Sequence, residues 1–443
     1  MERRVFVKSG ALALLALGMP PEFITRSLLA ETRAAARKKT LICIFQRGAV
    51  DGLNMVVPFG DKSYFSDRRS IAIQAPARAT TGGALDLNGF FGLHPALQPL
   101  RDLYTRNEMA IVHAVGSPHP TRSHFDAQDF METGTPGVKS TRDGWLNRVL
   151  AGTPHDCADC TGRTLDNRQA HAADHTSGQL AMASGVSALR GISLGAETPR
   201  ALRGKYPTLS IPDLDTFGVA GGRDASMENA FTRTYGTEAG TIIGNAADGA
   251  FEAMQILKRA NLTQYRPASG VEYPAGEFGR SLRQIAQLIK AGVGVEIAFV
   301  DIGGWDTHQA QGGDQGQLAN RFRELSRGIR ALYDDLGDRM DDVVLLTMSE
   351  FGRTVRENGT GGTDHGHATC MMVMGGPVAG GKVYGEWPGL AREQLYEGRD
   401  LAVTTDFRDL FAEVVQKHLG AKELGKVFPG YVVNPEKFRG VLG

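Results

Sequence analysis

Four short, continuous apolar runs constrain the fold of this chain more than any other feature. Runs of this length without polar alternation are typical of strands buried on both faces, the usual state of a strand in a parallel sheet. We therefore predict that they form central strands of a mostly parallel sheet. The runs are 41–45, 109–115, 295–300 and 343–347.

Helical patterns lie between these runs. In 318–336, apolar residues recur at the spacing of one helix face, and 281–291 and 407–419 show the same period. Strands that alternate with helices predict an α/β fold with helices on both faces of the sheet. The segment 153–270 has weak periodicity and is rich in Ala, Gly, Thr and Asp. We interpret it as an insertion or cap of short helices and loops.

The N-terminus predicts an export signal. A charged start with paired arginines precedes a short apolar run, and a small-residue stretch ends at Ala36. The paired arginines resemble the twin-arginine signal, which exports folded proteins; an ordinary secretory signal or a basic amphipathic tail are the alternatives. We expect a signal peptide at 1–36, recognised by the twin-arginine export machinery. The mature protein, 37–443, is then periplasmic or extracellular.

Charge and cysteine content narrow the class of protein. Lys+Arg and Asp+Glu balance at 49 each, so no broad field favours nucleic acid or an anionic membrane. No run in the mature chain is long enough for a membrane-spanning helix. Cys157 and Cys160 cannot alone form a four-ligand zinc site, and a local disulfide is favoured over a redox role. Cys43 and Cys370 lie in apolar runs and are predicted to be buried thiols.

Acids, imidazoles and a hydroxyl follow the predicted strands. In open α/β sheets, ligands bind outside the carboxyl ends of the strands. Each residue alone could be a turn residue, a helix cap or a salt-bridge partner, but together they predict a metal site at one sheet edge. Imidazole with carboxylate suits zinc, manganese or iron better than calcium. The residues are Asp51, Arg122, Ser123, His124, Asp301, Asp306, His308, Glu350, Asp364, His365 and His367.

Ser123 stands where a nucleophile could act. It precedes a helix-like segment, 126–132, and unpaired amides at a helix start favour a bound phosphate or sulfate. A hydroxyl is a weak nucleophile until a metal or base activates it. Arg122 or His124 could steady the anion, since arginine suits a tetrahedral oxyanion.

The motifs resemble those of the alkaline phosphatase superfamily, which includes sulfatases and phosphodiesterases. More closely, the chain resembles the exported family catalogued as domain of unknown function 1501, over nearly its whole length. The segments that carry this resemblance are Gly48-Ala-Val-Asp-Gly-Leu-Asn54, Ser123-His-Phe125, Gly303-Gly-Trp-Asp-Thr-His308, Ser349-Glu-Phe-Gly-Arg353 and Asp364-His-Gly-His367. The resemblance implies an alkaline-phosphatase-like three-layer sandwich: a mostly parallel sheet between helices, with an inserted cap.

The resemblance also implies roles for the strand-end residues. Ser123 would be the nucleophile, and a divalent metal, zinc in one or two ions with manganese or calcium as alternatives, would be held by the acids and histidines. Phe351 occupies a position where the superfamily expects a metal-binding histidine, which puts the second metal in doubt. The implied ligands are Asp51, Asp306, His308, Glu350 and His365, with Asp301 as an additional acid and Asp364 and His367 as extra groups.

These observations predict an exported, metal-dependent hydrolase of a phosphate or sulfate ester, either a small molecule or borne on a polymer. Phe351 and the segment 153–270 motivate an alternative, a non-catalytic binding or envelope-assembly protein on a degenerate phosphatase scaffold. A thiol redox protein using Cys157 and Cys160 is a third, weaker reading. The sequence indicates neither the substrate nor the oligomeric state.

Overall fold

The computed structural model describes residues 38–76, 81–153, 188–214, 253, 256–257, 260 and 262–443. Residues Thr40–Gly443 form one compact unit, and Met1–Lys39 are a separate one. The predicted signal peptide at 1–36 and the Cys157–Cys160 pair lie outside the described residues. Among the helices of the described part, none combines the length and apolar character that a membrane span requires.

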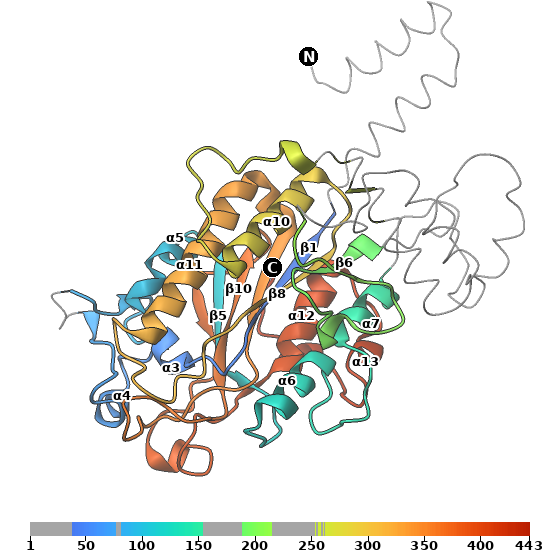
Figure 1. The fold of residues 1–443 in the computed structure, drawn as a ribbon. Coiled ribbons are helices and arrows are strands. Elements are labelled where there is room, and N and C mark those ends of the chain that lie inside the picture. Colours follow the sequence, from blue (N-terminus) through green and yellow to red (C-terminus); the bar gives the residue numbers. More distant parts are fainter. Residues whose placement is uncertain are drawn as a thin grey trace, which may run out of the picture. The chain divides into compact units, whose positions relative to one another are not determined.

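A nine-stranded sheet forms the centre of the described unit (Figure 1). Its main path runs β11-β5-β10-β9-β1-β8-β6-β7, and β12 pairs with β5. Every described strand of this sheet runs in one direction except β10, which is antiparallel to both β5 and β9. The strands are β1 (Thr40–Gln46), β5 (Met109–Gly116), β6 (Gly191–Ser193), β7 (Leu209–Ser210), β8 (Ile297–Ile302), β9 (Val343–Met348), β10 (Thr369–Gly375), β11 (Lys382–Tyr384) and β12 (Thr405–Asp406).

Helices cover both faces of this sheet, as Figure 1 shows. Side chains of β1 alternate: Ile42 and Ile44 pack in the core that includes α5, α10 and α11, whereas Cys43 and Phe45 pack in the core that includes α6, α7, α12 and α13. The three-layer α/β sandwich with a mostly parallel sheet is therefore confirmed. The helices are α5 (Gln98–Thr105), α6 (His124–Thr133), α7 (Trp145–Gly152), α10 (Glu277–Ala291), α11 (Gln317–Leu336), α12 (Phe407–Leu419) and α13 (Leu424–Val427).

The four predicted apolar runs are the buried strands β1, β5, β8 and β9. The predicted helices at 281–291, 318–336 and 407–419 correspond to α10, α11 and α12. Cys43 and Cys370 are buried free thiols, as predicted. Of the segment interpreted as a cap, β6 and β7 instead extend the central sheet from β8. Residues 188–214 thus contribute to the main sandwich, and 154–187 lie outside the described residues.

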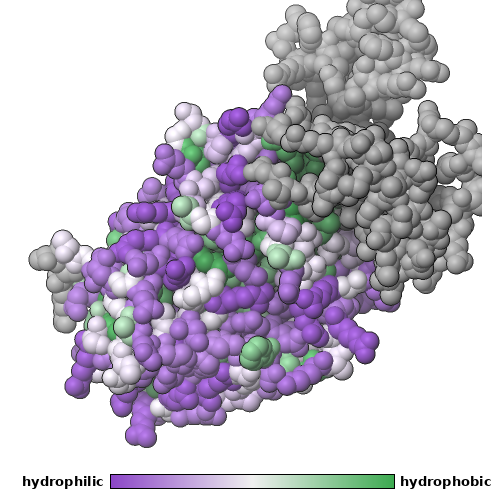
Figure 2. Space-filling model, viewed as in Figure 1, coloured by the Kyte–Doolittle hydropathy of each residue, from purple (hydrophilic) through white to green (hydrophobic). Residues whose placement is uncertain are grey.

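A small second sheet lies beside the loop after β1. It has the order β2-β4-β3. The helices α3 (Gly52–Met55) and α4 (Lys62–Asp67) accompany it, and its strands are β2 (Val56–Val57), β3 (Leu85–Asp86) and β4 (Gly92–Leu93). The face of the molecule in Figure 2 is mainly hydrophilic, with small scattered apolar patches.

The reversed direction of β10 decides where its loop lies. The loops after β1, β5, β8 and β9 leave the carboxyl edge of the sheet, whereas the loop with Asp364, His365 and His367 precedes β10. Because β10 runs the opposite way, the start of this strand lies at that same edge. Five chain segments thus bring polar side chains to one edge.

Candidate metal centre

Four side chains converge at the carboxyl edge of the sheet, and we call them the histidine cluster: His124, Asp306, His308 and His365. His124 begins α6, Asp306 and His308 follow β8, and His365 precedes β10. Asp306 Oδ1 lies 2.9 Å from His308 Nε2 and 3.3 Å from His365 Nε2, and Oδ2 lies 3.5 Å from His124 Nε2. The ligand atoms of His124, Asp306 and His365 all lie within 4.8 Å of one another, a spacing that could hold a metal ion.

The three histidines of the cluster share one orientation. Each Nδ1 atom donates a hydrogen bond to an oxygen that can only accept, so each neutral ring leaves its lone pair on Nε2. All three Nε2 atoms face the carboxylate of Asp306, which is how metal-bound histidines are oriented by surrounding acceptors. The Nδ1 contacts are His124 to Glu350 Oε1 (2.8 Å), His308 to Asp364 Oδ1 (2.9 Å) and His365 to the carbonyl of Arg122 (2.8 Å).

The cluster is rich in lone pairs and fits a cation. His308 Nε2 and His365 Nε2 lie 3.0 Å apart, and two lone pairs at this separation repel unless a positive charge lies between them. His124 Nε2 is buried and has no hydrogen-bond partner among the described residues. Ligands about 2.0–2.1 Å from a tetrahedral zinc lie about 3.3–3.5 Å from one another, close to the spacings here. The imidazoles of His124 and His365 and the carboxylate of Asp306 therefore suit zinc or a similar divalent ion, with His308 next to Asp306.

Glu350 supports His124 rather than facing the cluster. Its side chain is completely buried, and Oε1 accepts hydrogen bonds from His124 Nδ1, Gln128 Nε2 and the Gly48 amide at 2.8–2.9 Å. Burial opposes ionisation, but these hydrogen bonds outweigh it and lower the pKa of Glu350. The hydrogen bond to this carboxylate also raises the pKa of His124. Glu350, a predicted metal ligand, thus contacts the Nδ1 side of His124 and orients its ring.

Gly48 allows the loops after β1 and β8 to meet beneath the cluster. Its φ is +114°, a value that side-chain-bearing residues rarely adopt. A Cβ atom at this position would lie 2.8 Å from the amide nitrogen of Asp306. Glycine is thus required where its amide reaches Glu350 and its backbone passes Asp306.

Arg353 brings a fixed positive charge to Asp306. Its side chain is completely buried, and Nη1 donates to Asp306 Oδ1 at 2.7 Å. The guanidinium also donates to the hydroxyl and carbonyl of Thr363. Burial acts to raise the pKa of Asp306, but Arg353 more than offsets it and keeps that pKa below the ordinary value. The carboxylate of Asp306 is therefore ionised and available to a cation through Oδ2.

Phe351 forms an apolar wall against two of the histidines. Its ring centroid lies 5.0 Å from that of His124 and 5.1 Å from that of His365. The two imidazoles meet edge to face, with centroids 4.3 Å apart. The residue that stands in place of an expected metal ligand thus packs against the rings and restricts their orientation.

The structure does not bring Asp51, a predicted metal ligand, into the histidine cluster. The residue is completely buried. Its Oδ2 accepts from Arg68 Nη1 at 2.6 Å and from Gln311 Nε2 at 2.7 Å, and Oδ1 accepts from the Asn54 amide that begins α3. An ion pair with a buried arginine and a helix cap occupy both oxygens, so the fold uses this carboxylate structurally.

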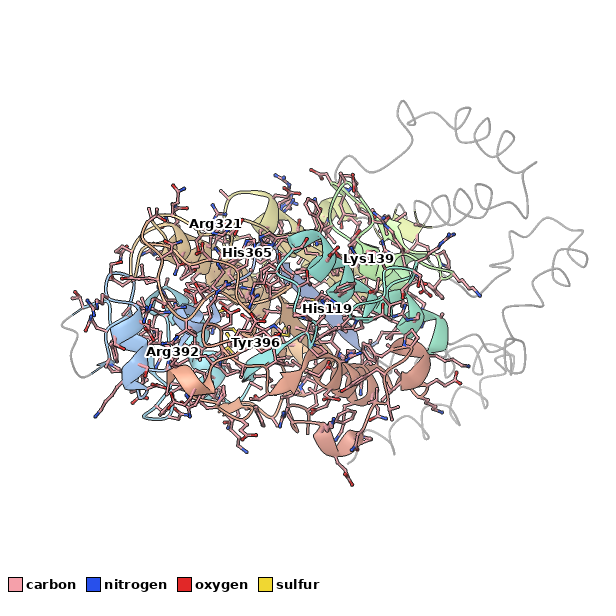
Figure 3. All side chains as sticks on the ribbon, turned by 90° about the horizontal axis from the view of Figure 1, so that it is seen from below. His119, Lys139, Arg321, His365, Arg392 and Tyr396 are labelled. Atoms are coloured by element: carbon pink, nitrogen blue, oxygen red, sulfur yellow. The ribbon has the colours of Figure 1, made fainter. Side chains whose placement is uncertain are left out.

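Arg122 and His367 also have other partners. The Arg122 guanidinium pairs with Asp400 at 2.6 Å and with Glu397 at 2.7 Å, so only its carbonyl reaches the cluster. His367 is buried and stacks on Tyr396 with ring centroids 4.3 Å apart. Both residues hold the loop that contains Tyr396 and Asp400 against the site, in place of the predicted anion-binding and ligand roles. Figure 3 labels His365 and Tyr396 in one view.

Asp301 and Asp364 occupy different places at the edge of the site. Asp301 pairs with Arg47 at 2.7 Å, and its side chain has no described contact with the cluster. Asp364 accepts from His308 Nδ1 and from Asn358 Nδ2 at 3.2 Å, so it orients His308 instead of facing the other ligands. The hydrogen bond from His308 lowers the pKa of Asp364. Asp364 is thus a positioning residue, like Glu350.

Ser123 precedes His124 at the start of α6. It is the N-cap residue, it is exposed, and its hydroxyl makes no hydrogen bond to the described residues. Its amide donates to Thr121 Oγ1 at 3.2 Å, which fixes the backbone where α6 begins. The neighbouring Phe125 is 90% exposed. A free hydroxyl and an open helix start therefore stand beside the histidine cluster.

Three residues of the site were given no role from the sequence. Gln128 lies one helix turn after His124, a spacing that could have identified it as a neighbour. Arg353 stands in a motif that carries the family resemblance, but only the fold shows that it contacts Asp306. Arg68 follows a short helix in a polar stretch, and no pattern indicates that it is completely buried. Burial of an arginine depends on partners distant in sequence.

The fold and this centre define an α/β-sandwich protein with a histidine- and carboxylate-lined site at the carboxyl edge of its sheet. The chain belongs to the family described as "Protein of unknown function (DUF1501)", whose model matches residues 38–428. The predicted family is thereby confirmed. A comparison with curated proteins found no match.

Three solved structures are similar to this chain at low sequence identity. One is the C-terminal periplasmic domain of EcEptC from Escherichia coli in complex with zinc: 10% identity, TM-score 0.31, covering 77% of this chain and 74% of that one. A second is Ps i-CgsB in complex with k-i-k-neocarrahexaose: 10% identity, TM-score 0.35, covering 89% and 74%. The third is PsFucS1 sulfatase from Pseudoalteromonas sp.: 12% identity, TM-score 0.33, covering 82% and 68%.

Proposed function

We propose that the histidine cluster binds one divalent cation and that this centre hydrolyses a phosphate or sulfate ester outside the cytoplasm. The observation that supports this most strongly is the common orientation of His124, His308 and His365, whose Nε2 atoms face Asp306 while acceptors occupy every Nδ1. The carboxylates Glu350 and Asp364 and a carbonyl maintain this orientation. We favour zinc, because its usual ligands are these groups.

One cation is proposed rather than two. The resemblance makes Asp51 a metal ligand, but its carboxylate is engaged by Arg68 and Gln311. Phe351 adds an apolar ring where a further imidazole would be needed. Both observations argue against a second ion at the described centre.

Ser123 is the proposed nucleophile. A bound cation would withdraw charge from an ester oxygen and favour attack at phosphorus or sulfur. The Ser123 oxygen would form a bond to that atom and give its proton to water. The bond from that atom to the ester oxygen would break, and the leaving alkoxide would take a proton from water. Water then releases phosphate or sulfate and restores the hydroxyl. Unpaired amides at the start of α6 are placed to hold the anion, since the next residues of the helix follow Ser123 directly.

The test compares wild type with Ser123→Ala, using Ser66→Ala on α4 as a surface control. Metal content is measured by elemental analysis, and turnover is measured with aryl phosphate, phosphodiester and aryl sulfate esters. Ser123→Ala should keep its metal and lose about 10³-fold or more in turnover, as expected for loss of a nucleophile. Equal turnover by Ser123→Ala would remove this residue from the mechanism.

The proposed twin-arginine signal is tested separately. Changing Arg3 and Arg4 to lysine should abolish export of the protein.

A second candidate function is that of an exported binding or envelope-assembly protein without turnover. Phe351 and the structural use of Asp51 favour it, because each removes a group that the superfamily uses in catalysis. This candidate predicts that the protein purified from the exported fraction contains no stoichiometric metal and hydrolyses none of the three esters. A stoichiometric metal together with ester turnover excludes it.

A further inference from the structure

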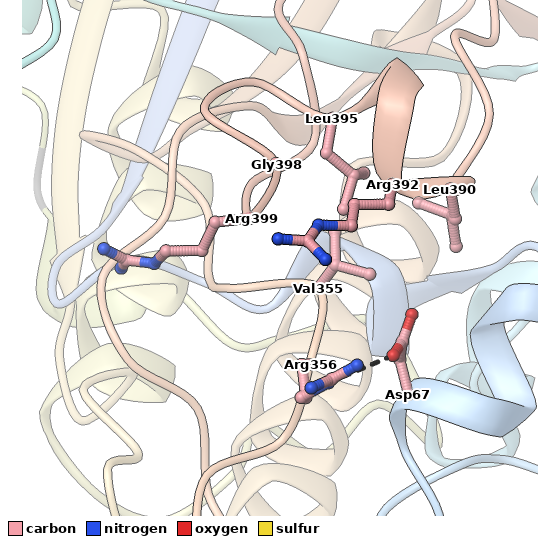
Figure 4. A pocket seen from close by; sticks show the side chains of 8 residues that line it. All are labelled: Asp67, Val355, Arg356, Leu390, Arg392, Leu395, Gly398 and Arg399. Carbon is pink, nitrogen blue, oxygen red and sulfur yellow. Dashed lines mark hydrogen bonds and ion pairs between the residues drawn. The ribbon is translucent and has the colours of Figure 1, made fainter.

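A basic pocket lies beside the segment that carries Arg353. It has a volume of about 300 Å³ and is lined by the residues drawn in Figure 4: Asp67, Val355, Arg356, Leu390, Arg392, Leu395, Gly398 and Arg399. Three of these residues are arginines and one is an acid. Val355 and Leu390 are almost completely buried and form an apolar floor. The lining thus combines excess positive charge with an apolar surface.

The arginines of this pocket are unequally paired. Arg356 contacts Asp67 at 3.2 Å, and Arg399 contacts Asp400 at 3.3 Å. Arg392 forms no ion pair with any described carboxylate. In Figure 4 the guanidinium of Arg392 extends toward Val355 rather than away from the pocket. An unpaired guanidinium over an apolar floor is suited to a tetrahedral or planar oxyanion, which it can bind through two parallel N–H groups.

The pocket is joined to the histidine cluster by short stretches of chain. Arg353 contacts Asp306 and forms an isolated β-bridge with His365. The pocket residues Val355 and Arg356 lie two and three residues further along the chain. Arg399 lines the pocket and donates to the carbonyl of His365. Because an extended residue spans about 3.3–3.6 Å, Arg353 and Arg356 lie at most about 11 Å apart along the chain. The segment that carries Arg353 and Val355 thus connects the histidine cluster with the pocket.

We propose that this pocket binds a second phosphate or sulfate group, so that the substrate is an ester carrying at least two such anionic groups. One group is hydrolysed at the histidine cluster, and the other is held by Arg392 with Arg356. The apolar floor contacts the organic part of the same molecule. The assignment to the substrate rests on the proposed function, whereas oxyanion binding in the pocket does not.

The first measurement is calorimetric titration of the full protein with inorganic sulfate and inorganic phosphate. Arg392→Gln should weaken binding about tenfold, since it removes a charge-assisted contact to the anion. Asp67→Asn should tighten binding, because it frees Arg356. Arg330→Gln, on α11 beside Asp334, is the control and should match wild type. If Arg392→Gln binds sulfate and phosphate as wild type does, or if wild type shows no saturable binding, the proposal that this pocket binds an oxyanion is wrong.

The second measurement separates a substrate group from a free ion. An aryl ester with one phosphate or sulfate is compared with one carrying two, in wild type and Arg392→Gln. KM should rise about tenfold only for the doubly charged ester, with kcat unchanged. Equal KM values for that ester in both proteins overturn the assignment to the substrate. Absence of turnover with either ester would instead count against the proposed function, and the titration would still decide the pocket.

Discussion

Asp51 and Asp306 are two carboxylates at neighbouring strand ends, and each lies within 2.7 Å of a completely buried arginine. Asp51 follows β1 and is itself fully buried, with its oxygens taken by Arg68, Gln311 and an amide. Asp306 follows β8, and its side chain is 43% exposed. Arg353 occupies one of its oxygens, while Oδ2 faces an unpartnered imidazole nitrogen.

The difference shows that a strand-end position alone does not make a carboxylate a ligand. Both acids are paired with arginine, but at Asp51 every acceptor site faces the protein interior. At Asp306 the single positive charge of Arg353 faces the carboxylate oxygens together with the lone pairs of three Nε2 atoms. One arginine cannot balance all of these electron-rich groups. The two carboxylates are also connected, because Gln311 donates to Asp51 and accepts from Thr307, the residue after Asp306. Asp51 thus supports from beneath the loop that carries the candidate site.

Replacing Asp306 gives the largest expected effect. In Asp306→Asn the charged ligand is lost while the side-chain shape is kept, so metal affinity should fall by more than about 100-fold, beyond the 10- to 100-fold typical of outer partners. Equilibrium titration with zinc and elemental analysis measure this. Folding stability should also fall, because the buried Arg353 loses its carboxylate partner. The fall should be smaller than at Asp51, since Asp306 is partly exposed and Arg353 keeps its hydrogen bonds to Thr363. Retention of full metal content by Asp306→Asn is incompatible with the proposed centre.

The matched change at Asp51 should show the opposite pattern. Asp51→Asn leaves the buried Arg68 without a countercharge, which typically costs about 3–5 kcal/mol of folding free energy. Urea denaturation measures this cost. Zinc affinity of the folded protein should fall far less than in Asp306→Asn, because Asp51 reaches the site only indirectly, through Gln311 and Thr307. If Asp51→Asn lost its metal as completely as Asp306→Asn, the two acids would belong to one site and the comparison would fail.

Most of the fold could be predicted because its determinants are local. The apolar runs that became β1, β5, β8 and β9 reveal two-sided burial directly, and the helix period locates α10, α11 and α12. The direction of β10 could not be predicted in this way. An apolar run has the same composition whichever way the strand runs. Only the antiparallel pairing of β10 with β5 and β9 shows its direction.

The candidate site was only partly predictable for a related reason. The strand-end rule found His308, His365, Asp306 and His124, but it gave no means of separating ligands from the groups that orient them. Whether Glu350 faces a cation or an imidazole depends on a few ångströms of tertiary placement. Asp51 forms an ion pair with Arg68, which lies 17 residues away, and no sequence pattern indicates that Arg68 is buried.

The smallest expected effect concerns a histidine outside the site. His113, on β5, is almost fully buried: Nε2 donates to the carbonyl of Val56 and Nδ1 accepts from the Ala114 amide. Burial lowers its pKa from 6.5 to about 4. The unfolded chain therefore binds a proton first as pH falls. The folding free energy that the neutral His113 contributes is fully present above pH 6.5 and is lost as the pH falls from 6.5 to about 4.

The cost for this one group should reach about 2 kcal/mol at pH 5, from about 1.4 kcal/mol per unit of pKa difference. Urea denaturation at pH 8 and pH 5 measures the loss in wild type and in His113→Gln. The variant should be less stable at pH 8 but lose about 2 kcal/mol less on acidification. An identical loss in both proteins would show that His113 titrates normally in the fold. Burial of the ring would then not be enough to distinguish a structural histidine such as His113 from the histidines of the cluster.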